Sequence, residues 1–260
     1  MGEEFYQAVV IGIFISAAIT FTALFFLSAP YGRHGRKGCG LVLDPRWAWL
    51  IMESPSFLIM AAMAIFGHRI SGAEAIGVRG FPLFFFGLWE LHYGYRCFMY
   101  PFRIRRTEKN PFPVVLMAMA VFYNSANAYV NGFWLFASGR HYESSWISDP
   151  RFAAGIVLFF TGALTHLKSD AILRGLRRPG ENGYKIPFDG LFRYVSSPNY
   201  LGEIVEWYGF AIATWSLAGL SFAVFTTANL LPRALSNHRW YHETFPEYPK
   251  DRKALIPFLL

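Results

Sequence analysis

Residues 170–207 read DAILRGLRRPGENGYKIPFDGLFRYVSSPNYLGEIVEW, and they form the longest polar interruption of a chain that is otherwise apolar. Basic and acidic side chains alternate with glycine, proline and aromatic residues along this stretch. A disordered linker is poor in aromatic and branched apolar residues. The mixture therefore indicates a folded loop that binds an anionic partner, and the alternative is a basic cytoplasmic loop that only sets membrane topology.

The composition of the whole chain is that of a membrane protein. Of the 260 residues, 54% are hydrophobic and 16% are charged, against about 25% charged residues in soluble domains. The net charge of +7 comes from loops between apolar runs, which suits anionic headgroups or a phosphate-bearing ligand better than nucleic acid. Cys39 and Cys97 are too few for a disulfide framework or a metal quartet, so we predict no metal site.

Apolar runs long enough to cross a bilayer, which takes roughly 20 residues, recur along the chain. We predict spans at 5–29, 47–66, 81–102, 113–137 and 152–167, followed by a longer run at 200–231. The last run is too long for one span, so it is either one tilted helix or a tight hairpin of two helices.

The lysines and arginines between these runs decide the number of spans, because short cytoplasmic loops are rich in them. The first five loops alternate between many and few such residues, and the basic tail joins the rich side only if two spans follow residue 198. The sequence therefore predicts an all-α integral membrane protein of seven transmembrane helices, with its N-terminus outside and its C-terminus in the cytosol.

Ionisable side chains inside predicted spans are costly to bury, so each one is a candidate for function. Glu53 lies two residues before Pro55, which tends to kink a helix. Tyr93, Arg96 and Tyr100 lie at positions i, i+3 and i+7 and share one helix face. A carboxyl group and a phenol that face one cavity would polarise a substrate carbonyl, and the alternative is that Glu53 is a structural partner of Arg96 or of another helix.

Other polar groups indicate helix contacts and helix ends. Asn124, Asn127 and Asn131 repeat at i, i+3 and i+7, and we expect helix–helix hydrogen bonds from them. Asn199 is expected to cap the free amides of a helix that begins beside it. The basic and aromatic tail at 238–253 is either an interfacial anchor or the lid of a polar site.

Several runs resemble the steroid 5α-reductase family, the 3-oxo-5α-steroid 4-dehydrogenases. They are the segment at 169–207, GFAIATWS at 209–216, EYPKDRKALIPFLL at 247–260, YGRH at 31–34, ESPS at 53–56, LHY at 91–93 with Arg96, and DPRF at 149–152. The resemblance covers nearly the whole chain. There are departures: Met52 stands where mammalian relatives have Gln, Asp189 where they have Gly, and Asn237 where they have His.

The resemblance implies one reductase domain over residues 1–260, with the substrate-side helices in 1–151 and most of the NADPH site in 152–260. The implied reaction is the NADPH-dependent reduction of the 4,5 double bond of 3-oxo-Δ4 steroids to 5α-steroids, with hydride going to C5 and a proton to C4. Glu53 and Tyr93 are then the catalytic pair that polarises the C3 carbonyl.

The resemblance also implies a set of cofactor-binding residues, namely Asp170, Arg177, Tyr184, Lys185, Asn199, Glu203 and Tyr241. Arginines are also dense at 103–106 and 174–178, where they can pair with a 2′-phosphate. This adds Arg103, Arg105 and Arg174 to the predicted site and favours NADPH over NADH.

Three alternatives remain from the sequence. They are a reductase of the same fold that acts on an enoyl thioester or a polyprenol, a membrane methyltransferase that uses S-adenosylmethionine, and a sterol-binding or transport protein. S-adenosylmethionine has no phosphate for the arginines of 170–198. We expect a monomeric, multi-pass protein of a bacterial inner membrane or an endoplasmic reticulum membrane, with a steroid or related lipid substrate and no nucleic-acid partner.

Overall fold

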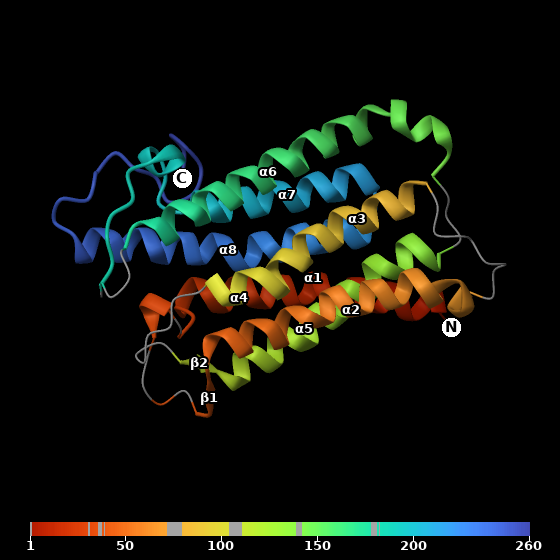
Figure 1. Ribbon diagram of the computed structural model, residues 1–260, viewed down its shortest axis with the longest axis horizontal. Helices are drawn as coiled ribbons and strands as arrows, with labels where there is room; N and C mark the ends of the chain where they lie inside the picture. Colours follow the sequence, from red (N-terminus) through yellow and green to blue (C-terminus); the bar gives the residue numbers. More distant parts are fainter. Residues whose placement is uncertain are drawn as a thin grey trace. The chain divides into compact units, whose positions relative to one another are not determined.

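Long helices make up most of the protein in the computed structural model (Figure 1), which describes residues 2–30, 32–35, 38, 40–71, 80–103, 111–138, 142–177, 181 and 183–260. They are α1 (Gly2–Phe26), α2 (Pro45–Ser71), α3 (Phe81–Gly94), α5 (Val114–Phe136), α6 (Pro150–Gly175), α7 (Pro198–Thr214) and α8 (Leu217–Thr244). A π-helical turn, η2 (Tyr95–Met99), continues α3 into the short α4 (Tyr100–Arg103). The prediction of a helical protein is confirmed.

Short elements connect these helices. They are the 3₁₀ helices η1 (Gly32–His34), η3 (Ser144–Ser148) and η4 (Gly190–Arg193), and the strands β1 (Val42–Leu43) and β2 (Phe112–Pro113), which pair antiparallel. The chain divides into two compact units. Unit 1 comprises Met1–Ile15, Ala29–Asp149 and Ser216–Ser221, and unit 2 comprises Ser16–Ser28, Pro150–Trp215 and Phe222–Leu260.

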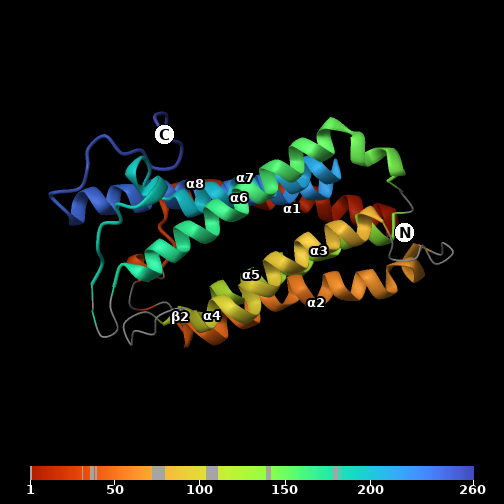
Figure 2. The same cartoon turned by 45° about the horizontal axis from the view of Figure 1, so that its top comes forward.

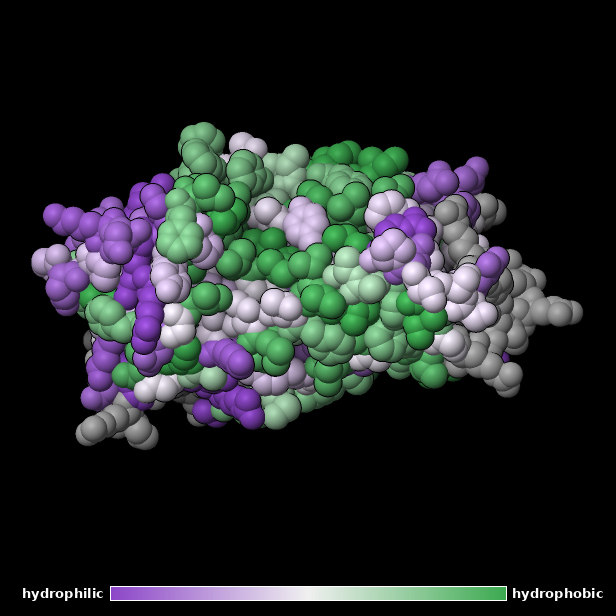
Figure 3. Space-filling view, turned by 90° about the horizontal axis from the view of Figure 1, so that it is seen from above, coloured by the Kyte–Doolittle hydropathy of each residue, from purple (hydrophilic) through white to green (hydrophobic). Residues whose placement is uncertain are grey.

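Three helices in the described part of the chain are long and apolar enough to cross a membrane, at Gly2–Phe26, Pro45–Gly67 and Pro150–Gly175. Along α1, Ile11, Ile15 and Ile19 each expose more than half of their surface. Hydrophobic residues also cover much of the face shown in Figure 3. Such a surface is unfavourable in water and suits lipid, so the prediction of a membrane protein is confirmed.

In unit 1, α2 and α5 pack along each other (Figures 1 and 2). The Asn124 amide donates to the main-chain carbonyl of Met52 on α2, so the prediction of a helix–helix hydrogen bond is confirmed at this residue. Asn131 instead donates within α5, to the carbonyl and side-chain oxygens of Asn127 at 3.0 Å. All three asparagines are buried.

Proline inside α2 changes the local hydrogen bonding. Pro55 has no N–H, so it leaves the carbonyl of Ile51, one turn earlier, without its usual donor. The Ser54 hydroxyl donates to this carbonyl at 3.1 Å. The side chain thus compensates for the missing helical hydrogen bond beside Glu53.

In unit 2, four glycines bring the backbones of α6 and α7 into contact. They are Gly155 and Gly162 on α6, and Gly202 and Gly209 on α7, seven residues apart in each case. A Cβ atom at any of the four would overlap main-chain atoms of the opposite helix. Figures 1 and 2 both show the two helices side by side.

The long apolar run at 200–231 is a hairpin of two helices. α7 ends at Thr214, the next residue Trp215 has a left-handed φ of 45°, and α8 begins at Leu217. The Trp207 ring on α7 lies 4.2 Å from the Phe222 ring on α8, and Ile204 packs near Leu230. Of the two alternatives for this run, the hairpin is confirmed.

Candidate active site

The buried carboxyl group of α2 forms an ion pair in unit 1. The Arg96 guanidinium on η2 donates to Glu53 Oε1 at 3.1 Å, and Glu53 is 7% exposed. The same guanidinium lies 4.6 Å from the Trp49 ring centroid and 5.0 Å from that of Tyr100. The sequence left open whether Glu53 is a structural partner of Arg96, and the structure shows this contact.

Tyr93 lies near the end of α3, just before the π-helical turn. It is 3% exposed and its ring lies 4.9 Å from that of Trp89. The Trp89 indole in turn donates to the Ser56 carbonyl at 3.0 Å, which fixes α3 against α2. A π-helical turn is rare and often accompanies a functional site. The i, i+3 spacing of Tyr93 and Arg96 predicted one face of a regular α-helix, but the π-helical turn begins between these two residues.

Two of the predicted cofactor arginines, Arg103 and Arg105, follow α3 in the chain. Arg103, the last residue of α4, places its guanidinium 5.6 Å from the Tyr95 ring centroid in unit 1. Arg105 lies outside the described residues.

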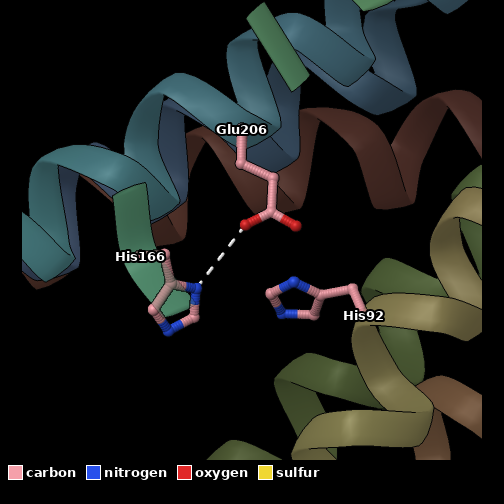
Figure 4. A group of neighbouring side chains, drawn as sticks. All are labelled: His92, His166 and Glu206. Carbon is pink, nitrogen blue, oxygen red and sulfur yellow. Dashed lines mark ion pairs between the residues drawn. The ribbon is translucent and has the colours of Figure 1, made fainter. Parts of the chain in front are cut away.

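In unit 2 a histidine and three carboxylates cluster between α6 and α7. His166 Nδ1 lies 3.6 Å from Glu206 Oε2, and Figure 4 marks this ion pair with a dashed line. His166 Nε2 lies 3.5 Å from Asp170 Oδ2 and 3.9 Å from Glu203 Oε2. His166 is 3% and Glu206 is 2% exposed. The glycine contacts between α6 and α7 position this cluster, because Gly202 lies against the His166 backbone and Gly162 against that of Glu206.

Asp170 connects this cluster to two further predicted residues. The Asn199 amide donates to Asp170 Oδ1 at 3.1 Å, and Arg174 Nη1 lies 4.0 Å from Asp170 Oδ2. The prediction of Asn199 as a helix cap is wrong, since Ser197 precedes α7 without a side-chain cap and Asn199 bonds to α6 instead. Asp170 and Arg174 are also helical, because α6 continues to Gly175 beyond the predicted span.

The segment after α6 holds the next group. Arg177 donates to the Gly183 carbonyl at 2.9 Å, and its guanidinium lies 5.2 Å from the Tyr184 ring centroid. The Lys185 ammonium lies 2.6 Å from Glu181 Oε2. The Tyr184 ring also lies 5.1 Å from that of Trp240 on α8.

The C-terminal segment folds back onto the residues before α7. Tyr241 is 2% exposed and stacks on Tyr248 at 4.9 Å. The Ser196 hydroxyl lies 2.6 Å from His238 Nδ1 and 2.7 Å from the Tyr248 hydroxyl. Burial, with the positive charges of His242 and Lys253, lowers the pKa of His238 to about 4. His238 is therefore neutral at physiological pH.

Comparisons with known proteins identify the family. Residues 110–260 match the family model described as 3-oxo-5-alpha-steroid 4-dehydrogenase. The steroid 5-alpha-reductase of Solanum lycopersicum is 42% identical over 260 residues, which are 99% of this chain and 98% of the relative. The 3-oxo-5-alpha-steroid 4-dehydrogenase 1 of Bos taurus is 41% identical over 243 residues, which are 93% of this chain and 92% of the relative.

The chain belongs to the 3-oxo-5α-steroid 4-dehydrogenase family. The resemblance inferred from the sequence is therefore confirmed, and the chain is an oxidoreductase of steroid metabolism. This membership favours the steroid reductase over the methyltransferase and the sterol-binding protein.

Sequence reasoning missed two groups of this protein. His166 lies one residue before the end of a predicted span, so the rule that an ionisable group in a span is a candidate could have found it. No spacing pattern pointed to the contact of Ser196 with His238, which are 42 residues apart.

Proposed function

We propose that this family member uses NADPH to reduce the 4,5 double bond of 3-oxo-Δ4 steroids to 5α-steroids. The observation that carries the proposal is the similarity to steroid 5-alpha-reductases over nearly the whole length of both chains. A third relative, from Arabidopsis thaliana, is 37% identical over 262 residues, which are 99% of this chain and 97% of the relative.

The polar residues of unit 2 fit a nicotinamide dinucleotide. Arg174 and Arg177 suit phosphate oxygens, and Tyr184 offers a ring beside Arg177. Carboxylates such as Asp170 and Glu203 accept hydrogen bonds from ribose hydroxyl or carboxamide groups. The other proposed contacts in unit 2 are Lys185, Asn199 and Tyr241. Arg103, which belongs to unit 1, and Arg105 stay predictions from the sequence. Bound NADPH supplies the hydride, and the protein supplies orientation and electrostatics.

The chain itself acts on the C3 carbonyl of the steroid. An enone accepts hydride at C5 only as negative charge develops on the carbonyl oxygen, and a proton then goes to C4. The Tyr93 hydroxyl donates to this oxygen, and one such donor in a dry cavity contributes about 3–4 kcal/mol. Glu53 contributes through its ion pair with Arg96, because it fixes a guanidinium that has several N–H donors.

The proposed enzyme is a monomeric multi-pass protein with one reductase domain. We place seven spans in α1, α2, α3 to α4, α5, α6, α7 and α8, with the N-terminus outside and the C-terminus in the cytosol. The lysines and arginines of the loops support this orientation. The membrane is a bacterial inner membrane or an endoplasmic reticulum membrane, from which a steroid can partition into the protein.

The decisive experiment follows NADPH oxidation by the purified protein as candidate substrates are added. We expect oxidation with a 3-oxo-Δ4 steroid, a 5α product by mass spectrometry, and a higher catalytic efficiency with NADPH than with NADH. Oxidation only with an enoyl thioester or a polyprenol precursor would favour the other reductases of this fold. Equal efficiency with both nucleotides would contradict the arginine contacts to a 2′-phosphate.

A further inference from the structure

We propose that His166 is a positioning residue, a buried imidazolium that joins α6 to α7 and orients Asp170 and Glu203 for cofactor binding. This inference rests on the proposed function, because it assigns these two carboxylates to the cofactor. It gives His166 and Glu206, which the sequence analysis did not place in the site, a role in it.

The geometry indicates the protonated ring. Both ring nitrogens of His166 face carboxylate oxygens, with Nδ1 3.6 Å from Glu206 and Nε2 3.5 Å from Asp170. A neutral imidazole has only one N–H, so it would turn a lone pair toward one of the two carboxylates. The imidazolium has a proton on each side and partly offsets the buried negative charge.

The side-chain exposures order the cluster from inside to outside. Glu206 is 2% exposed, Asp170 is 9% exposed and Glu203 is 18% exposed, while the His166 ring between them is 3% exposed. The innermost carboxylate lies within ion-pair distance of Nδ1, and Nε2 lies near the two outer carboxylates. A carboxylate on one ring nitrogen fixes the orientation of the other. Glu206 therefore acts on Asp170 and Glu203 through His166.

The neighbouring groups complete the positioning of Asp170. The Asn199 amide from α7 donates to its Oδ1 at 3.1 Å, while its Oδ2 faces His166 and, at 4.0 Å, Arg174. Asp170 Oδ1 thus accepts a hydrogen bond from α7, and its Oδ2 lies within ion-pair distance of two basic groups on α6. Loss of the imidazolium would release one oxygen and leave three carboxylates close together beside an anionic cofactor.

The test compares NADPH binding and turnover in purified variants. His166→Gln keeps a polar side chain but loses the charge and the second ring N–H. We expect it to raise the Kd for NADPH, and the KM for NADPH, by about tenfold, the effect of losing one charge-assisted contact. The kcat at saturating NADPH and the KM for the steroid should change by less than about twofold, a split that a general loss of folding would not give.

Two further variants separate positioning from packing. Phe159→Leu disturbs the same helix pair, because Phe159 is 2% exposed and lies 6.3 Å from the Trp207 ring. It should lower the melting temperature and leave the Kd for NADPH unchanged. Glu206→Gln has the shape of the original side chain and should raise this Kd less than His166→Gln does. If His166→Gln fails to fold, the Kd of Glu206→Gln for NADPH is the measurement that tests the proposal.

The double variant tests whether Glu206 acts through His166. If it does, His166→Gln with Glu206→Gln should bind NADPH no more weakly than His166→Gln alone. Additive losses would overturn the proposal, as would an unchanged Kd in His166→Gln or an equal loss in Phe159→Leu. If the unsubstituted protein does not bind NADPH, the proposed function fails and this inference fails with it.

Discussion

At the scale of single residues, Tyr93 is the group whose substitution should affect the reaction most directly. Tyr93→Phe removes a hydroxyl and keeps the buried ring against Trp89. We expect single-turnover reduction, with steroid and NADPH saturating, to slow by roughly 10²–10³-fold, the loss expected for one oxyanion-type donor. NADPH binding should be unchanged. A single-turnover rate equal to that of the unsubstituted enzyme would exclude Tyr93, and Tyr241 would be the next candidate.

Glu53 gives a second prediction, because its carboxyl group pairs with the Arg96 guanidinium. Glu53→Gln should reduce turnover about as severely as Glu53→Ala, since both remove the carboxylate that pairs with the largely buried Arg96 guanidinium. Steady-state assays of the two variants, with the melting temperature measured in parallel, compare them. If Glu53→Gln kept most of the activity, the carboxyl group would be a neutral donor to the substrate instead.

The lowered pKa of His238 leads us to expect that the thermal stability of the protein depends on pH. Its folded-state pKa of about 4 lies below the ordinary value of 6.5, so the unfolded chain binds the proton more readily. The contribution of the neutral His238 side chain to the stability of the fold is therefore present above about pH 6.5, and it is lost as the pH falls toward about 4. Thermal melts across this range should show the loss, and His238→Gln should reduce it. An identical pH profile in the variant would show that other groups cause the dependence.

At the scale of helices, the glycines between α6 and α7 predict sensitivity to a single methyl group. Gly202→Ala places a Cβ against the backbone of His166, an overlap that should cost about 2–3 kcal/mol of stability. Gly87→Ala is the matched control, because a Cβ at this helical position meets nothing within 4 Å. Thermal melts should show a lower midpoint only for Gly202→Ala. Equal midpoints would mean that the helices can separate without loss.

The sequence predicted apolar helices well and polar helical ends poorly. A continuous apolar run defines α1 and α5, and their observed bounds lie within three residues of the predicted ones. The predicted span in α6 stopped at residue 167, because Lys168 and Asp170 end the apolar run. The helix continues because Asp170 finds partners on both α6 and α7. Such contacts depend on residues distant in sequence, and no local pattern contains them.

At the scale of the whole molecule, the membrane topology is the main prediction. Seven spans should place the N-terminus outside and Leu260 in the cytosol, because the loops rich in lysine and arginine then all lie on the cytosolic side. Reporter fusions after Leu260 and within the intervening loops test this order. A reporter active on the outer side after Leu260 would contradict the seven-span count.

The glycine contacts between α6 and α7 also limit how unit 2 can move. Most packed helices are separated by side chains that change rotamer, which lets the helices slide by small steps. At four glycines between these two helices, main chain lies against main chain, so no side-chain layer can adjust at those positions. α6 and α7 should therefore move together as one rigid body. Any rearrangement of unit 2 that admits or releases a ligand must then bend at other elements, and the carboxylates on both helices travel together when it does.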